Sequence, residues 1–185
     1  MDHCSNCETQ KAFPSELHVS TQTQLGKINA TIELSELAKS LNTSSNILYV
    51  EYGDDIRKGD NAKKSARKHK KAKPQKYFYN QVTIHIRREN DKRVNMKIFN
   101  NGRVQMTGVI KSGQGLEKMR DLIKELNSIS AAERVLIFGH SDIIDHVPET
   151  ETVLINSNFD IGFEIDREAL HRLIIQEGYY SSYEP

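Results

Sequence analysis

The strongest constraint on the fold is an alternation of apolar and polar side chains through three segments, residues 77–86, 94–99 and 103–109. Successive side chains of an extended strand point to opposite faces, so a period of two is typical of a strand with one buried and one open face. Between the last two segments lies Asn100-Asn101-Gly102, and Asn and Gly tolerate the positive backbone angles of tight turns. The pattern predicts a meander of neighbouring strands.

The same period assigns each side chain of the meander to a face, because a slip of one residue would exchange the two faces. The buried face is expected to hold Val82, Ile84, Ile86, Val94, Met96, Ile98, Val104 and Met106. The outer face is expected to hold Tyr77, Tyr79, Gln81, Thr83, His85, Asn95, Lys97, Phe99, Arg103, Gln105 and Thr107. This outer set contains hydrogen-bonding groups, cations and aromatic rings but no acid, which suits contact with nucleic acid. An ordinary solvated sheet face is the alternative.

Helical spacing of apolar residues predicts short amphipathic helices on either side of this meander. The expected helices cover residues 33–41, residues 116–126 and the segment that follows Asp166 as N-cap. The other expected extended segments are residues 16–32, 47–52, 134–138 and 152–165, with a connecting loop over residues 139–149. An extended segment followed by a helix therefore occurs twice, once near each end of the chain.

Charge is segregated along the chain, although its formal net charge is only +1. Residues 57–76 carry ten Lys or Arg side chains against one Asp, whereas residues 130–185 carry three Arg against eleven acids. Residues 54–76 are expected to form a disordered insertion between two strands. Its cations would neutralise phosphates with little sequence preference, and a nuclear import signal or a solubilising loop are the alternatives. The candidate phosphate-binding residues there are Lys63, Lys64, Arg67, Lys68, Lys70, Lys71 and Lys73.

Two groups of residues have side chains that can bind metals. His3, Cys4 and Cys7 have the spacing of half a zinc site, but no second cysteine pair completes it, and a mobile tail is the alternative. His140, Asp142, Asp145 and His146 could bind a metal or supply acid–base catalysis, or could be ordinary polar loop residues. Because the sequence has no nucleophile elbow and no phosphate-binding glycine loop, we expect no catalytic site, metal, cofactor or small-molecule substrate.

Length and hydropathy indicate one domain of ordinary size or two halves that share a core, since the chain has 185 residues. No run approaches the roughly 20 apolar residues of a membrane span, and the N-terminus lacks a targeting signal. We therefore expect an intracellular protein with reduced thiols and no membrane partner.

Two motifs resemble the TATA-box-binding protein family. The segment I-F-N-N-G-R-V-Q-M-T-G, residues 98–108, is similar to the family's hairpin, and Y-S-S-Y-E-P, residues 180–185, is similar to the segment that follows the first helix of its second repeat. The resemblance covers roughly residues 16–185 and is greatest to the diverged members of large DNA viruses. Lys97 and Gln105 stand where the family has an apolar sheet floor, and Tyr79 stands where it has a phenylalanine.

The resemblance implies an α+β fold, a saddle made of two pseudo-repeats with a curved antiparallel sheet and helices on its convex face. It implies a non-enzymatic DNA-binding transcription initiation factor that bends the minor groove. Phe99 and Tyr79 would press on base steps, Lys97 and Arg103 would hold phosphates, and Asn95, Gln105 and Thr107 would form groove hydrogen bonds.

The expected organisation is a tail over residues 1–15, a first repeat over residues 16–129, a linker over residues 130–150 and the start of a second repeat over residues 151–185. The chain is then either a fragment or a saddle without the rest of its second half. Expected partners are double-stranded DNA and general transcription factors or RNA polymerase, in the nucleus or in a viral factory of the host cytoplasm. The alternative function is a protein-interaction module that recruits transcription machinery without touching DNA.

Overall fold

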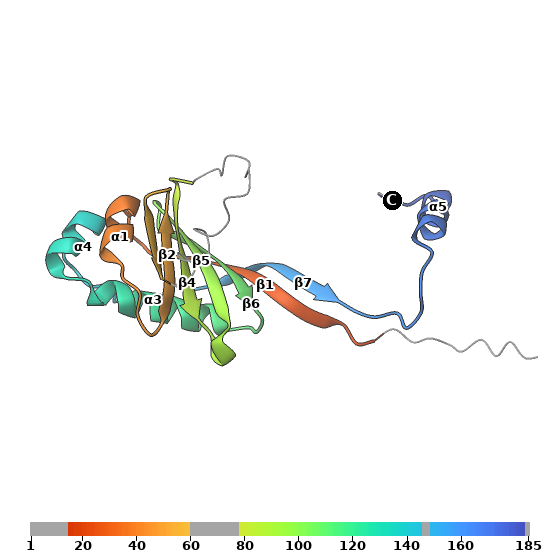
Figure 1. Ribbon diagram of the computed structural model, residues 1–185, viewed down its shortest axis with the longest axis horizontal. Helices are drawn as coiled ribbons and strands as arrows, with labels where there is room; N and C mark the ends of the chain where they lie inside the picture. Colours follow the sequence, from red (N-terminus) through yellow and green to blue (C-terminus); the bar gives the residue numbers. More distant parts are fainter. Residues whose placement is uncertain (1–14, 60–77, 146–148, 184–185) are drawn as a thin grey trace, which may run out of the picture. The chain divides into compact units, whose positions relative to one another are not determined.

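The computed structural model describes residues 15–59, 78–145 and 149–183. Two compact units are present, residues 19–157 and a unit formed by the chain up to His18 together with residues from Asn158 onward. In chain order the elements, shown in Figure 1, are β1 (His18–Lys27), α1 (Leu34–Ser40), β2 (Ile47–Tyr52), β3 (Ile56–Gly59), β4 (Gln81–Arg87), the 3-10 turn η1 (Glu89–Asp91), β5 (Arg93–Phe99), β6 (Arg103–Val109), α3 (Gln114–Ser128), α4 (Ala131–Phe138), β7 (Glu151–Asn158) and α5 (Arg167–Gln176). The expected boundaries of tail, repeats and linker stay predictions.

A seven-stranded sheet with the order β3-β2-β4-β5-β6-β1-β7 forms the framework. The predicted meander is confirmed as the antiparallel strands β4, β5 and β6. All eight side chains predicted for its buried face have no exposed surface. The turn between β5 and β6 is also confirmed, since the Gly102 amide donates to the Phe99 carbonyl oxygen at 3.0 Å and Gly102 has a φ of 77°.

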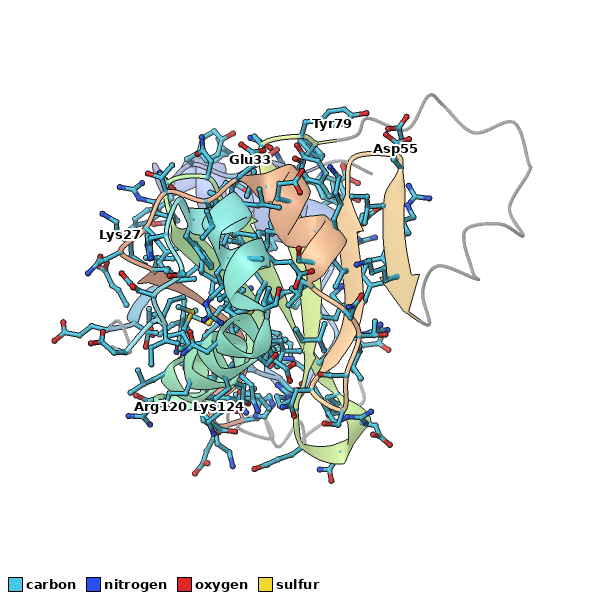
Figure 2. The ribbon with its side chains drawn as sticks, turned by 90° about the vertical axis from the view of Figure 1, so that its left-hand side faces the viewer. Lys27, Glu33, Asp55, Tyr79, Arg120 and Lys124 are labelled. Atoms are coloured by element: carbon cyan, nitrogen blue, oxygen red, sulfur yellow. The ribbon has the colours of Figure 1, made fainter. Side chains whose placement is uncertain are left out.

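Helices seal one face of this sheet and leave the other face without a helix among the described residues of the unit. The predicted helices appear as α1 and α3, which bury Leu37 and Ala38 and also Met119, Leu122 and Leu126 in the same core as the sheet. Figure 2, viewed from the helix side, shows α1, α3 and α4 in front of the strands. The resulting architecture is α+β and compatible with a TBP-like saddle.

Close contact between β1 and α3 depends on a glycine. A Cβ atom at Gly26 would lie 3.2 Å from Sδ of Met119, which is tighter than ordinary van der Waals contact. Met119 is itself completely buried. A side chain at position 26 would therefore force the Met119 side chain to shift by a few tenths of an ångström.

The expected disordered insertion over residues 54–76 is wrong in its first part. Residues Ile56–Gly59 form strand β3, which pairs antiparallel with β2. Lys58 explains part of this order, because its Nζ donates to the carbonyl oxygens of Lys39 at 2.6 Å and Leu41 at 2.9 Å, at the end of α1. A cation in this position satisfies carbonyl groups that the helix leaves without partners. Residues 60–76 lie outside the described residues.

The expected strand over residues 134–138 is also wrong, because these residues belong to helix α4. A capping box begins the helix: the Glu133 amide donates to Oγ of Ser130, and the Ser130 amide donates to the Glu133 carboxylate. Arg134 then donates through Nε to the Ser141 carbonyl oxygen at 2.9 Å and through Nη1 to the Asn127 carbonyl oxygen at 3.1 Å. The apolar run of residues 134–138 is by itself typical of a strand. The capping box and the hydrogen bonds of Arg134 favour a helix there instead.

The described part of the expected loop over residues 139–149 has no regular secondary structure. The last predicted helix is confirmed as α5, where the Asp166 carboxylate accepts from the amides of Glu168 and Ala169, both at 3.0 Å. No residue of α5 is buried. No described helix is both long enough and apolar enough to cross a membrane.

We predict that Ser130→Ala lowers the free energy of unfolding by about 1 kcal/mol, because the substitution removes the side-chain acceptor at the start of α4. Ser130→Thr keeps this acceptor and is the matched control, with an expected change of a few tenths of a kcal/mol. Urea titrations followed by circular dichroism measure both. Equal stabilities for the two variants would contradict the helix cap.

Candidate nucleic-acid interface

The outer face of the sheet carries most of the residues singled out from the sequence. Cross-strand register places Thr83, Lys97 and Gln105 in one row. The next row contains His85, Asn95 and Thr107. Lys97 and Phe99 project from the same face of β5, and both are partly exposed. The alternation of apolar and polar residues therefore predicted correctly that one set of side chains shares the outer face: Asn95, Lys97, Phe99, Arg103, Gln105 and Thr107.

Strand β1 extends these rows in a way that the sequence did not indicate. Its register with β6 pairs Thr23 with Thr107, Leu25 with Gln105 and Lys27 with Arg103. Sequence reasoning missed these residues because β1 is 76 or more residues away in sequence from β6, the strand that it pairs with. Alternation of apolar and polar residues shows which face a side chain occupies but not which strands are neighbours.

The face has few negative charges. No acid occurs on the outer-facing positions of β4, β5 and β6. On the neighbouring strand β2, Glu51 accepts a hydrogen bond from Nε of Arg57 at 3.1 Å, so its charge is balanced locally. Lys97 has no ion-pair partner among the described residues and keeps its charge available to a ligand. The face is therefore weakly basic, which favours polyanions over cationic ligands.

Tyr79, which the alternation assigns to the outer face, precedes strand β4. Strand β4 begins at Gln81, and Gln81 is the residue that opposes Phe99. The Tyr79 hydroxyl instead donates to Oδ1 of Asp54 at 2.6 Å, and its ring meets that of Tyr52 edge-on with centroids 5.9 Å apart. Figure 2 shows Tyr79 beside the turn that carries Asp55. This hydrogen bond raises the pKa of the Tyr79 hydroxyl.

Tyr49 and His85 form a stacked pair on the outer face, with ring centroids 4.9 Å apart. Burial lowers the pKa of His85, and the positive charge of Arg93 lowers it further. Burial also raises the pKa of Tyr49 to about 12. Both rings are therefore uncharged near neutral pH. Tyr49 was missed because an irregularity of register between Ile47 and Tyr49 changes which face the β2 side chains occupy.

Asn95 has an unsatisfied polar atom. Its Oδ1 is buried and has no hydrogen-bond partner among the described residues. A buried acceptor without a donor is unfavourable by about 1–3 kcal/mol. Asn95 lies in the row between His85 and Thr107, so the unsatisfied atom belongs to the candidate interface.

The basic segment and the two metal-site candidates are only partly described. Lys63, Lys64, Arg67, Lys68, Lys70, Lys71 and Lys73 lie outside the described residues, as do His3, Cys4, Cys7 and His146. Nδ1 of His140 lies 3.7 Å from Oδ2 of Asp142. Within the described ranges, no three His, Cys, Asp or Glu side chains are grouped so that they could hold a metal.

We predict that the free energy of unfolding falls between pH 7.5 and pH 5.5, in part because of His85. The unfolded chain takes up a proton near the ordinary pKa of 6.5, whereas the folded chain resists protonation of His85, so acid favours the unfolded state. His85→Gln should reduce this fall. Thr83→Val, at a neighbouring outer-face position without a titratable group, is the control that should leave it unchanged. Urea titrations at both pH values would contradict the account if the two variants lost equal stability on acidification.

Comparison with known proteins reveals a distant similarity. No family model matches the chain. A protein described as "TATA-box-binding protein-like" from Acanthamoeba polyphaga mimivirus is 25% identical over 178 aligned positions, which cover 85% of this chain and 45% of the relative. The chain thus spans less than half the length of this curated relative. The similarity agrees with the two sequence motifs and supports a distant TBP-like relationship.

Proposed function

We propose that the protein is a non-enzymatic transcription initiation factor that binds duplex DNA with the outer face of its sheet. One observation carries this proposal: α1, α3 and α4 pack on the opposite face, so Lys97, Phe99, Asn95, Gln105 and Thr107 lie together on a face that no described helix of the same unit covers. The distant similarity to a TBP-like viral protein supports the same function.

Phosphate contacts in this proposal come from Lys97 and Arg103. Neutralising phosphates releases condensed counterions, so affinity depends strongly on salt and only weakly on base sequence. The cations of residues 57–76 would add to this sequence-independent affinity. Arg57 and Lys58 are less available than the rest, since Arg57 pairs with Glu51 and Lys58 binds the end of α1.

Groove contacts come from the neutral polar side chains and one ring. Asn95, Gln105 and Thr107 can donate to the N3 and O2 acceptors that every minor groove presents. Phe99 ends β5 at the tight turn, a position from which its ring can enter between base pairs. Among the described residues of β4, β5 and β6, no other phenylalanine or tyrosine accompanies it on this face. We therefore expect one wedge per chain from this part of the sheet.

Fluorescence anisotropy of a labelled duplex at two salt concentrations tests the proposal. Phe99→Ala should weaken binding about fivefold or more, since stacking on an aromatic ring contributes about 1–3 kcal/mol per base. Lys97→Gln should weaken binding at low salt and reduce the slope of log affinity against log salt by about one. Lys124→Gln, an equal loss of charge on the exposed side of α3, is the matched control.

The effect of the sheet must be measured separately from that of the basic segment, because the cations of this segment can bind DNA by themselves. We would therefore repeat the measurements in a chain whose Lys63, Lys64, Arg67, Lys68, Lys70, Lys71 and Lys73 are all changed to Gln. Persistence of the Phe99→Ala and Lys97→Gln effects in this background supports the outer face. Absence of wild-type binding at low salt, or affinities unaltered by both substitutions, would contradict the proposed function.

A further inference from the structure

Lys27 and Arg103 form an unusual pair at one end of the outer face. The two residues are directly opposite each other on β1 and β6, and both are exposed. Like charges directly opposite each other in an antiparallel pair are destabilising. Figure 2 shows Lys27 at the periphery of the ribbon, away from Arg120 and Lys124 on α3. The repulsion between the two cations is therefore unfavourable for folding, and a bound anion would reduce it.

No acid of the described chain forms an ion pair with either of these two cations. Other cations are matched with acids nearby, such as Lys39 with Glu36 at 2.7 Å and Lys118 with Asp121 at 2.9 Å. Neither Lys27 nor Arg103 has an ion-pair partner among the described residues, although Glu149 and Glu151 line the same hollow of about 650 Å³. The two cations are thus free to bind a ligand that enters from solvent.

We propose that Lys27 and Arg103 together bind a single phosphodiester group of duplex DNA, an inference that rests on the proposed function. Directly opposed residues have Cβ atoms about 4.5–5.5 Å apart, so both long side chains can reach one phosphate. The arginine offers a planar fork that matches two phosphate oxygens, and the lysine adds a compact charge.

The location of this site gives it a specific role. The turn Asn100–Gly102 joins Phe99 directly to Arg103, so the cation pair lies at the same end of the face as the wedge. A phosphate held there fixes the backbone beside the base step that Phe99 enters. Lys27 thus becomes a DNA-binding residue from a strand that the alternation of the meander does not include.

Glu149 and Glu151 on the other side of the hollow should oppose the same ligand. Their charges repel a phosphate at close range and reduce its affinity for the cation pair. Glu151→Gln should therefore tighten binding of DNA, most clearly at low salt, where screening is weakest.

The salt dependence of DNA binding tests whether the two cations share one phosphate. Lys27→Gln and Arg103→Gln singly leave that phosphate neutralised by the remaining cation, so each single variant should change the slope of log affinity against log salt by much less than one. The double variant should reduce the slope by about one. Lys124→Gln is again the control for net charge.

Each outcome of these titrations decides the proposal. A double variant with the wild-type slope overturns the site, and a reduction of about two overturns the sharing of one phosphate. In either case the proposed function stands if the wild-type chain binds DNA and if Phe99→Ala and Lys97→Gln weaken this binding as predicted. If the wild-type chain does not bind DNA at all, both the shared phosphate site and the proposed function are overturned. Thermal unfolding without DNA should show melting temperatures for the single variants equal to or above wild type, and a lower temperature would assign the pair a structural role instead.

Discussion

The fold depends on one physical requirement, that one face of a β-sheet must be removed from water. Val82, Ile84 and Ile86 on β4 are completely buried, and the helices provide the surface that covers them. The inward-facing apolar residues of β5 and β6 are buried in the same way, namely Val94, Met96, Ile98, Val104 and Met106. Because side chains alternate strictly along a strand, sealing this face fixes the outward direction of every intervening residue. The composition of the open face is thus decided by the same register that builds the core.

This coupling explains how much of the structure the sequence predicts. The strands of the meander, their faces and the turn at Gly102 follow from local alternation and turn chemistry. Helices α1, α3 and α5 follow from apolar spacing and, for α5, from the Asp166 cap. These features depend on residues that are close together in the sequence, so local patterns are sufficient to predict them.

The features that the sequence did not predict depend on long-range contacts or on competing local signals. Strand β3 is held by Lys58, whose carbonyl partners lie near residue 40. Helix α4 has an apolar run typical of a strand, but the Ser130–Glu133 capping box favours a helix. The hydrogen bond between Tyr79 and Asp54 joins two separate segments of the chain, and Lys27 joins the outer face only through the pairing of β1 with β6.

The orientation of bound DNA is the most direct test of the central claim. A DNA-cleaving iron chelate would be attached at Thr107→Cys on the outer face or at Lys124→Cys on α3, in a chain whose Cys4 and Cys7 are changed to Ser. The account predicts strong cleavage of a bound duplex from position 107 and little from position 124. Equal cleavage from both positions, or stronger cleavage from position 124, would show that the open face of the sheet is not where DNA binds.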